Sequence, residues 1–436
     1  MIVLTGIAIL ILLLVMGLPV AFCFGGATLF LVIALDYSPL FLVPYGYSSI
    51  ASVTLWCIPL FIIAGSIIKR GKIGDALVDF VDQFIGKIKG GLGIVTVITC
   101  GIFGAIAGNG SATMSAIGSI MAPKLREKGY PRGISASLIA SASVLGLLIP
   151  PSSAQIVYAW VSNQSVLACF LATVVPGIIL AILLCIVQAF MIRNLDIQSG
   201  SAETPPASSA AAPSFLSKTG RAFPALLMPV IILGGIYGGF MTPMESAAIA
   251  TLYCIPVAIF FYRGMKFREL GECLVESGKA SGNVAVMLMT AMLFSRILTM
   301  EKIPDAMVKA ITGVSTNKYL ILLLVNLLLF VVGMLMEDGC GIMLCTPLLL
   351  PVVQAVGVSP IQFAAIIGVN LGMGLITPPT APLLYFASQV GDAPIGEMLK
   401  PTMTFILFAW LPATLLTTYV PALSLTLPRL IMGITP

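Results

Sequence analysis

The sequence contains no histidine, and only 9% of its 436 residues are charged. Soluble domains carry about 25% charged residues, so most of this chain is not built to face water. Histidine is the commonest metal ligand and a frequent general base. The nine cysteines are scattered without a C-x-x-C pair, which argues against zinc, haem and disulfides. We therefore expect no enzymatic activity and no cofactor other than coupling ions.

The net charge of +5 lies in short clusters between apolar runs. Such clusters orient helices in a membrane, because cytoplasmic loops collect Lys and Arg. They do not form the continuous basic face that nucleic-acid binding requires, so we expect no nucleic-acid partner.

Hydrophobic residues make up 59% of the chain, and many runs reach the roughly 20 residues that span a bilayer. We expect a multi-pass, all-α integral membrane protein with ten to twelve hydrophobic passes, some of them incomplete. The segment from Met1 to Val15 lacks the basic start and the cleavage site of a secretory signal, so we expect it to be a retained first helix.

The chain divides near its centre into two related halves, 1–195 and 222–436. The connecting segment 196–221 is rich in Ser, Ala and Pro and is expected to be a linker. Six residues of the first half recur 228 positions later, which indicates duplication: Pro123, Gly129, Gly146, Leu147, Pro150 and Pro151 recur as Pro351, Gly357, Gly374, Leu375, Pro378 and Pro379.

Charge predicts opposite orientations for the two repeats. The segment that follows Pro123 contains Lys124, Arg126, Lys128 and Arg132, whereas its counterpart 352–360 has no charged residue. Because basic loops stay in the cytoplasm, the two segments should face opposite sides of the membrane. The fold class is therefore predicted to be an inverted repeat.

Each half contains one expected re-entrant hairpin and one expected broken helix. The hairpins are predicted at about 92–128 and 319–357, and the broken helices at about 132–165 and 360–390. Polar, Gly-rich tips lie at the middle of the hairpins, where irregular backbone is tolerated only inside protein or beside a cavity. A double proline interrupts each following helix, because proline lacks an N–H group and blocks the carbonyl four residues earlier.

Freed carbonyls and half-helix C-termini coordinate sodium in broken-helix transporters, so we expect one sodium site between tip and break in each half. The first site is predicted to use Gly108, Asn109, Ser111, Thr113, Ile149 and Pro150. The second is predicted to use Glu337, Asp338, Gly341, Thr377 and Pro378. Substrate contacts are expected from Ser111, Ser115, Ser152, Ser153 and Thr380.

These polar runs have a plainer explanation, namely close helix packing through small residues. Their pairing by the repeat favours a transport site. Glu337 and Asp338 could cap a helix, but intramembrane carboxylates are costly and usually functional. Thr242 and Glu245, in contrast, have the spacing of a capping box and are expected to be structural.

Amphipathic segments near Asp75–Ile88 and 305–311 are expected to lie at the membrane interface and to brace a fixed scaffold. A transport domain of hairpins and broken helices would slide against this scaffold. We therefore expect an elevator-type carrier.

Several motifs together resemble the large membrane subunit (M, or DctM-type permease) of TRAP transporters, the tripartite ATP-independent periplasmic transporters. The resemblance covers nearly the whole chain and rests on Ile106-Ala-Gly-Asn-Gly-Ser-Ala-Thr-Met-Ser-Ala-Ile-Gly118, Ile149-Pro-Pro-Ser152, the run from Gly234 to Ala248, and Gly374-Leu-Ile-Thr-Pro-Pro379. The first tip departs from the family's Gly-Ser-Ser with Gly108-Asn109-Gly110, and the second carries Glu337 before Asp338.

This resemblance implies a sodium-driven elevator importer, or symporter, in the bacterial inner membrane. It implies two protein partners, a small membrane subunit and a periplasmic substrate-binding protein. It also implies small organic anions as cargo, such as C4-dicarboxylates or sugar acids. The alternative is a binding-protein-independent sodium/anion symporter of similar fold.

Overall fold

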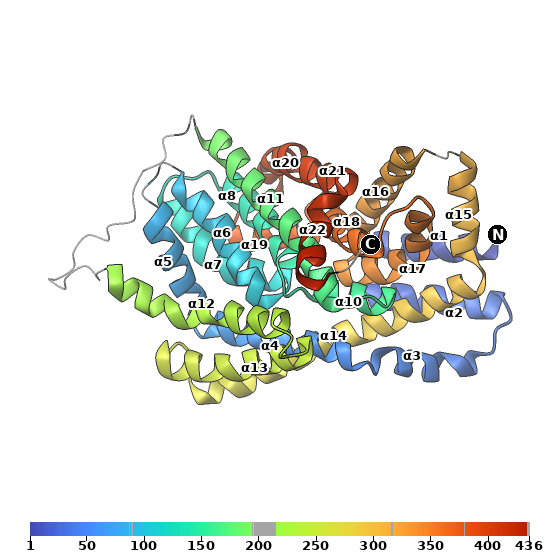
Figure 1. Cartoon of the computed structure of the whole chain (residues 1–436), viewed down its shortest axis with the longest axis horizontal. Coiled ribbons are helices and arrows are strands. Elements are labelled where there is room, and N and C mark those ends of the chain that lie inside the picture. Colours follow the sequence, from blue (N-terminus) through green and yellow to red (C-terminus); the bar gives the residue numbers. More distant parts are fainter. Residues whose placement is uncertain are drawn as a thin grey trace.

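The computed structural model describes residues 1–86, 88, 90–193, 195, 215–314, 317–378 and 380–433. Every regular element in these residues is helical (Figure 1), which confirms the all-α class. The expected linker 196–221 lies outside the described residues up to position 214, and its last residues belong to helix α12, which begins at Phe215.

The first half runs from the N-terminus to residue 195. Its helices are α1 (Ile2–Val15), α2 (Val20–Ala34), η1 (Pro39–Phe41), α3 (Leu42–Ile50), η2 (Val53–Trp56), α4 (Cys57–Arg70), α5 (Ile73–Ile85), α6 (Gly91–Ala107), α7 (Gly110–Glu127), α8 (Arg132–Ser143), α9 (Leu145–Leu148), α10 (Ser153–Ser162) and α11 (Val166–Ile192).

The second half follows the linker. Its helices are α12 (Phe215–Tyr237), α13 (Pro243–Pro256), η3 (Val257–Phe261), α14 (Phe267–Met300), α15 (Ile303–Val314), α16 (Lys318–Leu335), α17 (Asp338–Ala355), α18 (Pro360–Gly374), α19 (Pro382–Gly391), α20 (Ile395–Phe405), η4 (Ile406–Trp410), α21 (Leu411–Tyr419) and α22 (Pro421–Met432).

The apolar helices make this a multi-pass membrane protein. Among the described residues, eight helices are long and apolar enough to cross a bilayer, or nine if a bent pair counts as one span. Four further apolar helices, α1, α2, α6 and α18, are shorter, with 14 to 17 residues each. The apolar run 2–35 is two helices, because Gly17 adopts a left-handed φ of 77° and Pro19 immediately precedes α2.

Helix pairs stand where the sequence predicts the two hairpins. α6 and α7 form the first pair, and α16 and α17 form the second. Gly129 and Gly357 end these pairs with φ values of 85° and 74°, a conformation that glycine adopts at little cost. Both glycines belong to the recurring set, so the recurrence at this position has a local backbone reason.

Interruptions stand where the sequence predicts the broken helices. In the first half, α8–α9 and α10 are bent by 42° around the double proline. In the second half, α18 ends at Gly374 and α19 begins at Pro382.

Hairpins and broken helices of the two halves interlock. The Tyr158 hydroxyl on α10 donates to the Pro360 carbonyl at 2.6 Å, and the Gln155 amide donates to the Ala364 carbonyl on α18 at 3.1 Å. A third bond joins α8 to α20, where the buried Ser137 hydroxyl donates to the Met398 carbonyl at 3.0 Å. These bonds join elements more than 200 positions apart into one packed body, which we call the core body (α6–α10 and α16–α20).

A second group of helices flanks the core body. Figure 1 shows α3, α4 and α14 along one side of the molecule, and α14 packs against α2, α3, α4 and α17. Arg70 at the end of α4 pairs with Glu272 and Glu276 on α14, at 2.9 and 2.8 Å. We call α2–α4 and α14 the flanking scaffold.

Helix α5 connects the flanking scaffold to the first hairpin. Its buried side includes Leu77, Val78 and Val81, while Phe84 is 56% exposed. This is the one-sided pattern expected of an interfacial helix. Lys124 at the end of α7 pairs with Asp79 at 3.1 Å. Burial raises the pKa of the Asp75 carboxyl, and the Lys124 ammonium opposes that rise.

Candidate functional site

The first hairpin turns at a two-residue break between α6 and α7. Gly108 ends α6 with a φ of 62°. Asn109 then caps α7, because its Oδ1 accepts hydrogen bonds from the backbone N–H groups of Ser111 (2.8 Å) and Ala112 (3.2 Å). The Asn109 side chain that the sequence suggests as a sodium ligand therefore already satisfies two donors at the start of α7.

The first tip is bonded directly to the first double-proline break. The Gly108 carbonyl accepts from both the N–H and the hydroxyl of Ser153, each at 2.9 Å. The chain at this contact is closely packed, since a Cβ on Gly104 would lie 2.5 Å from the Gly146 Cα. The first tip and the first break are thus in direct contact, and the sodium site predicted between them stays a prediction.

Three further candidates lie at this contact. The Thr113 hydroxyl donates to the Asn109 carbonyl at 2.9 Å, and a Cβ on Gly146 would approach that hydroxyl to 2.7 Å. Ile149 and Pro150 follow the end of α9, where Pro150 offers no N–H group to Gly146. The Leu147 carbonyl, which Pro151 also leaves without a helical donor, accepts instead from the buried Ser152 hydroxyl at 2.7 Å.

The second hairpin turns at Met336 and Glu337. Glu337 precedes α17, yet its side chain makes no capping hydrogen bond. Asp338 is the first residue of α17 and is 8% exposed. Helix capping therefore does not account for the Glu337 carboxylate.

The second tip also packs on its own break. A Cβ on Gly374 would lie 2.4 Å from the Gly333 carbonyl carbon, and a Cβ on Gly341 would lie 3.0 Å from the Leu371 side chain. The Thr377 hydroxyl donates to the Met373 carbonyl at 2.7 Å. Small residues are needed at Gly333 and Gly374 because two backbones meet there.

The second break differs from the expectation of freed carbonyls. The Gly374 carbonyl accepts from the Thr377 N–H at 2.9 Å, and the Leu375 carbonyl accepts from the Leu383 N–H at 3.2 Å. A local turn and the start of α19 therefore supply donors for the two carbonyls that the prolines leave without helical partners. Pro378 lies in this turn, Pro379 lies outside the described residues, and the enclosed Thr380 hydroxyl has no hydrogen-bond partner.

Both tips line one cavity of about 340 Å³, which we call the tip cavity. Its walls include Asn109–Ser111 of the first tip and Met336–Asp338 of the second. Leu147 and Leu375, beside the two breaks, complete it together with the start of α19. None of the described residues that line it is basic.

The electrostatics of the tip cavity combine two opposite features. The N-termini of α7, α17 and α19 lie at its wall, where the helix dipole favours an anion. The N–H groups of Ser111 and Ala112 in α7, and of Leu383 and Leu384 in α19, already have acceptors within the protein, so the dipole acts here without those donors. Glu337 and Asp338 place carboxylates at the same wall. The arrangement suits an anion accompanied by cations.

A smaller cavity of about 30 Å³, which we call the contact cavity, lies between the two tips and the flanking scaffold. Asn109, Glu337 and Asp338 reach it from the tips, and Ser153 reaches it from α10. Ile58 on α4 and Leu288 on α14 face them. Sequence reasoning did not identify these aliphatic residues, since nothing distinguishes them from residues of any apolar helix.

Three of the remaining candidate residues, Ser115, Thr242 and Glu245, lie away from the two cavities. Ser111 lines the tip cavity, but Ser115 lines neither it nor the contact cavity. Thr242 and Glu245 stand at the start of α13, where the Thr242 N–H donates to the Glu245 carboxylate at 2.7 Å and the Glu245 N–H donates to the Thr242 hydroxyl at 3.3 Å. The structure therefore forms the capping box at this position.

Removing this cap should cost stability alone. Thr242→Ala is expected to destabilise the protein by about 1 kcal/mol, because the start of α13 loses a side-chain acceptor. Thermal unfolding of the purified protein in detergent measures this loss. Thr426→Ala is the matched control, since Thr426 is exposed within α22 and its hydroxyl donates to the Ala422 carbonyl four residues earlier. Equal melting temperatures of the two variants would contradict the assignment.

Comparison with known proteins gives consistent matches. Residues 7–423 match the family model described as "Tripartite ATP-independent periplasmic transporter, DctM component". The chain is 36% identical over 376 residues to the C4-dicarboxylate TRAP transporter large permease protein DctM of Pseudomonas aeruginosa, covering 86% of each chain. It is 30% identical over 418 residues to the sialic acid TRAP transporter large permease protein SiaM of Vibrio cholerae, covering 96% of each.

Two further matches concern length and fold. The isethionate TRAP transporter permease protein DctMQ of Oleidesulfovibrio alaskensis is 35% identical over 415 residues, which cover 94% of this chain but 64% of that longer protein. The solved structure of the YdaH transporter of Alcanivorax borkumensis superposes with a TM-score of 0.65 over 88% of each chain, at 13% identity. At that identity the likeness concerns the fold alone.

Proposed function

This chain belongs to the DctM family of TRAP transporter large permeases, and we propose that it imports small organic anions across the bacterial inner membrane, coupled to sodium ions. Its relatives are named as transporter permeases rather than enzymes. The observation that carries the proposal is the tip cavity, where three helix N-termini and two carboxylates meet without a basic side chain.

Sodium coupling follows from the charge balance of the tip cavity. An anion placed beside Glu337 and Asp338 meets two negative charges, and helix dipoles supply only about half a unit each. Sodium ions held by these carboxylates and by nearby carbonyls would offset the repulsion. Each ligand would then raise the affinity for the other by the same factor, which is the thermodynamic basis of symport.

Two sodium sites fit this scheme. In the first, oxygens near the contact of Gly108 and Thr113 with the first break (Ile149 and Pro150) hold one ion. In the second, Glu337, Asp338 and the turn around Thr377 hold another. Ser111 in the tip cavity and the enclosed Thr380 hydroxyl are the substrate contacts that the geometry favours.

An elevator movement would carry the cavity across the membrane. The hydrogen bonds between α10 and α18 and between α8 and α20 hold the core body together, so that it can move as one unit. The flanking scaffold meets it across the aliphatic walls of the contact cavity. An apolar, weakly hydrogen-bonded boundary lets one packed unit slide past another, and inverted repeats would make the two end states similar.

The proposed partners follow from the family. Its description is tripartite and periplasmic, and relatives are named large permeases. We infer a small membrane subunit and a periplasmic binding protein that delivers the anion. The relatives are named for C4-dicarboxylates, sialic acid and isethionate, and we take these three as the candidate cargo.

Counterflow in proteoliposomes tests this proposal. The complete transporter, with the small subunit and the binding protein, is expected to give saturable counterflow of one of these anions in NaCl and about background counterflow in choline chloride. Sodium-independent or non-saturable flux would contradict a sodium-coupled carrier. Equal uptake without the binding protein would instead favour a direct sodium/anion symporter.

A further inference from the structure

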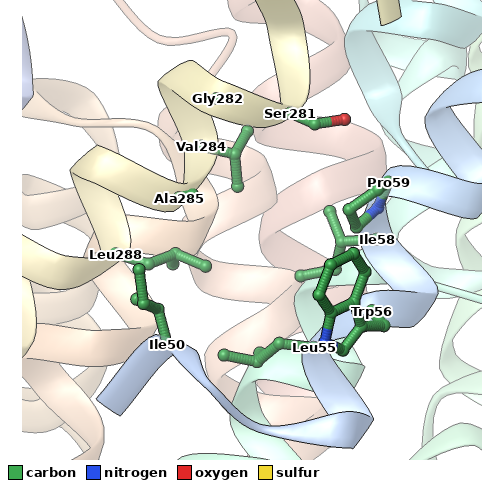
Figure 2. Close-up of a pocket in the computed structure, with 10 residues that line it drawn as sticks. All are labelled: Ile50, Leu55, Trp56, Ile58, Pro59, Ser281, Gly282, Val284, Ala285 and Leu288. Carbon is green, nitrogen blue, oxygen red and sulfur yellow. The ribbon is translucent and has the colours of Figure 1, made fainter. Parts of the chain in front are cut away.

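Two cavities outside the transport site differ sharply in chemistry. One, of about 310 Å³, lies between α14 on one side and α3, η2 and α4 on the other, and its walls are aliphatic side chains, proline and the ring of Trp56 (Figure 2). Ser281 contributes the one hydroxyl among the described residues that line it. The other, of about 270 Å³, has charges of both signs in its wall. We call it the charged pocket, and its wall includes Lys72, Asp75, Asp79, Arg221, Phe261 and Tyr262.

The charged pocket lies where three candidate membrane spans end. These spans are Val53–Arg70, Gly220–Tyr237 and Pro243–Phe261. Phe261 is 53% exposed, and aromatic side chains gather at the level of the lipid headgroups. Asp79 of the pocket pairs with Lys124 at 3.1 Å, and the positive-inside rule assigns the basic segment around Lys124 to the cytoplasm. The pocket therefore stands at the headgroups of the cytoplasmic leaflet.

Most of the charged groups in this pocket lack a partner. Asp79 has its ion pair with Lys124, whereas Lys72, Asp75 and Arg221 form no ion pair within the described part of the chain. Burial raises the pKa of the Asp75 carboxyl, the Lys124 and Lys72 ammonium groups oppose that rise, and Asp79 adds to it. A further cation close to Asp75 would stabilise its ionised form. The pocket thus has room and charge for a ligand that carries both signs.

We propose that the charged pocket binds the headgroup of phosphatidylethanolamine, a lipid that carries both a phosphate and a primary ammonium. The phosphate accepts hydrogen bonds from Lys72 and Arg221, and the ammonium donates to Asp75 and Asp79. The exposed ring of Phe261 packs against the start of the acyl chains. A choline headgroup has no N–H group to donate, and the headgroup of phosphatidylglycerol brings no cation to the two carboxylates.

A lipid in this position would leave the transport movement free. The lining residues belong to α5 and the residue before it, to α12, and to η3 and the residue after it. None of the described residues in this wall comes from the core body or from the walls of the tip cavity. The lipid would hold α5, α12 and η3 at the membrane surface while the core body moves.

Native mass spectrometry of the delipidated full-length protein tests this proposal. The protein is mixed with equal amounts of phosphatidylethanolamine, phosphatidylcholine and phosphatidylglycerol that have the same acyl chains. A hydrogen bond to a charged group contributes about tenfold or more in affinity, and exposure to water reduces that factor. We expect phosphatidylethanolamine to bind at least about fivefold more tightly than either of the other lipids.

Three variants locate the effect. Asp75→Asn is expected to reduce the preference for phosphatidylethanolamine over phosphatidylcholine to about one. Arg221→Gln is expected to weaken both lipids severalfold and to keep their ratio, because both carry the phosphate. Asp36→Asn is the matched control, since Asp36 is exposed, lies outside the charged pocket and has a left-handed φ of 55° that Asn adopts readily. This control is expected to keep the full preference.

Several outcomes would overturn the proposal. Equal binding of phosphatidylethanolamine and phosphatidylcholine would do so, as would a preference for phosphatidylglycerol or an unchanged preference in Asp75→Asn. Soluble glycerophosphoethanolamine is expected not to displace the lipid at equal concentration, because it has no acyl chains to bury. Displacement would identify a soluble zwitterion, and not a lipid, as the ligand.

Discussion

Asp338→Asn is expected to lower sodium-dependent uptake by about a hundredfold. Asp338 is buried at the start of α17 and lines both the tip cavity and the contact cavity. In the proposed sodium site Asp338 is one partner of a buried charge pair, and removing such a partner costs roughly 3–5 kcal/mol. Each 1.4 kcal/mol is a factor of ten in affinity, so the lower end of this range gives about a hundredfold. Counterflow measured as a function of sodium concentration should show a weaker apparent sodium affinity, not only a lower maximum rate.

Two further variants make this result specific. Glu337→Gln tests the neighbouring carboxylate, which makes no capping hydrogen bond and lines the same cavities. Asp392→Asn is the matched control, because Asp392 pairs with Arg126 and Arg132 on an exposed surface, where ion pairs contribute about 0–1 kcal/mol. Normal sodium dependence in both Asp338→Asn and Glu337→Gln would sink the proposed second sodium site.

A disulfide between Gly65→Cys and Ala112→Cys is expected to stop transport. Gly65 lies on α4 of the flanking scaffold and Ala112 lies near the first tip. A Cβ on Gly65 would be 3.9 Å from the Ala112 Cβ, within the range of about 3.5–4.5 Å that disulfides adopt. Oxidation would tie the core body to the scaffold, so counterflow should fall to background and recover after reduction.

Two controls distinguish a specific block of movement by the disulfide from general damage to the protein by oxidation. Each single cysteine variant should transport equally before and after oxidation, which excludes pairing with the nine native cysteines. A short thiol crosslinker between Arg126→Cys and Asp392→Cys joins α7 to α19 within the core body, where the native side chains pair at 3.3 Å. That crosslink should leave counterflow intact. Full activity of the oxidised Gly65→Cys/Ala112→Cys protein would rule out sliding of the core body along α4.

The positions of the helix breaks could be predicted because their causes are local. Two consecutive prolines remove two neighbouring helical donors, which is why the chain breaks at Pro150 and near Pro378, whereas single prolines such as Pro123 and Pro351 lie inside α7 and α17. Gly108 and Gly129 take left-handed conformations that glycine favours. Helix ends therefore fall near the positions that these residues indicate, whereas the contact between Gly108 and Ser153 depends on tertiary packing.

The roles of individual tip residues were harder to predict. Asn109 has the residue type of a ligand, but its side chain caps α7. Ser152 has the residue type of a substrate contact, but its hydroxyl satisfies the Leu147 carbonyl. The carbonyls of Gly374 and Leu375 at the second break find donors in a local turn and at the start of α19. These roles depend on which hydrogen-bond partner each side chain or carbonyl finds, and that is known only from the three-dimensional structure.

The sequence alone determined that this is a helical membrane protein with polar interruptions and a TRAP permease resemblance, because hydropathy, proline and glycine act through near neighbours. The tertiary structure alone decided that both tips share one cavity and that Ile58, Val284 and Leu288 line the smaller contact cavity beside it. Those walls come from helices more than 200 positions apart, and an aliphatic residue facing a cavity has the same sequence signature as one facing lipid.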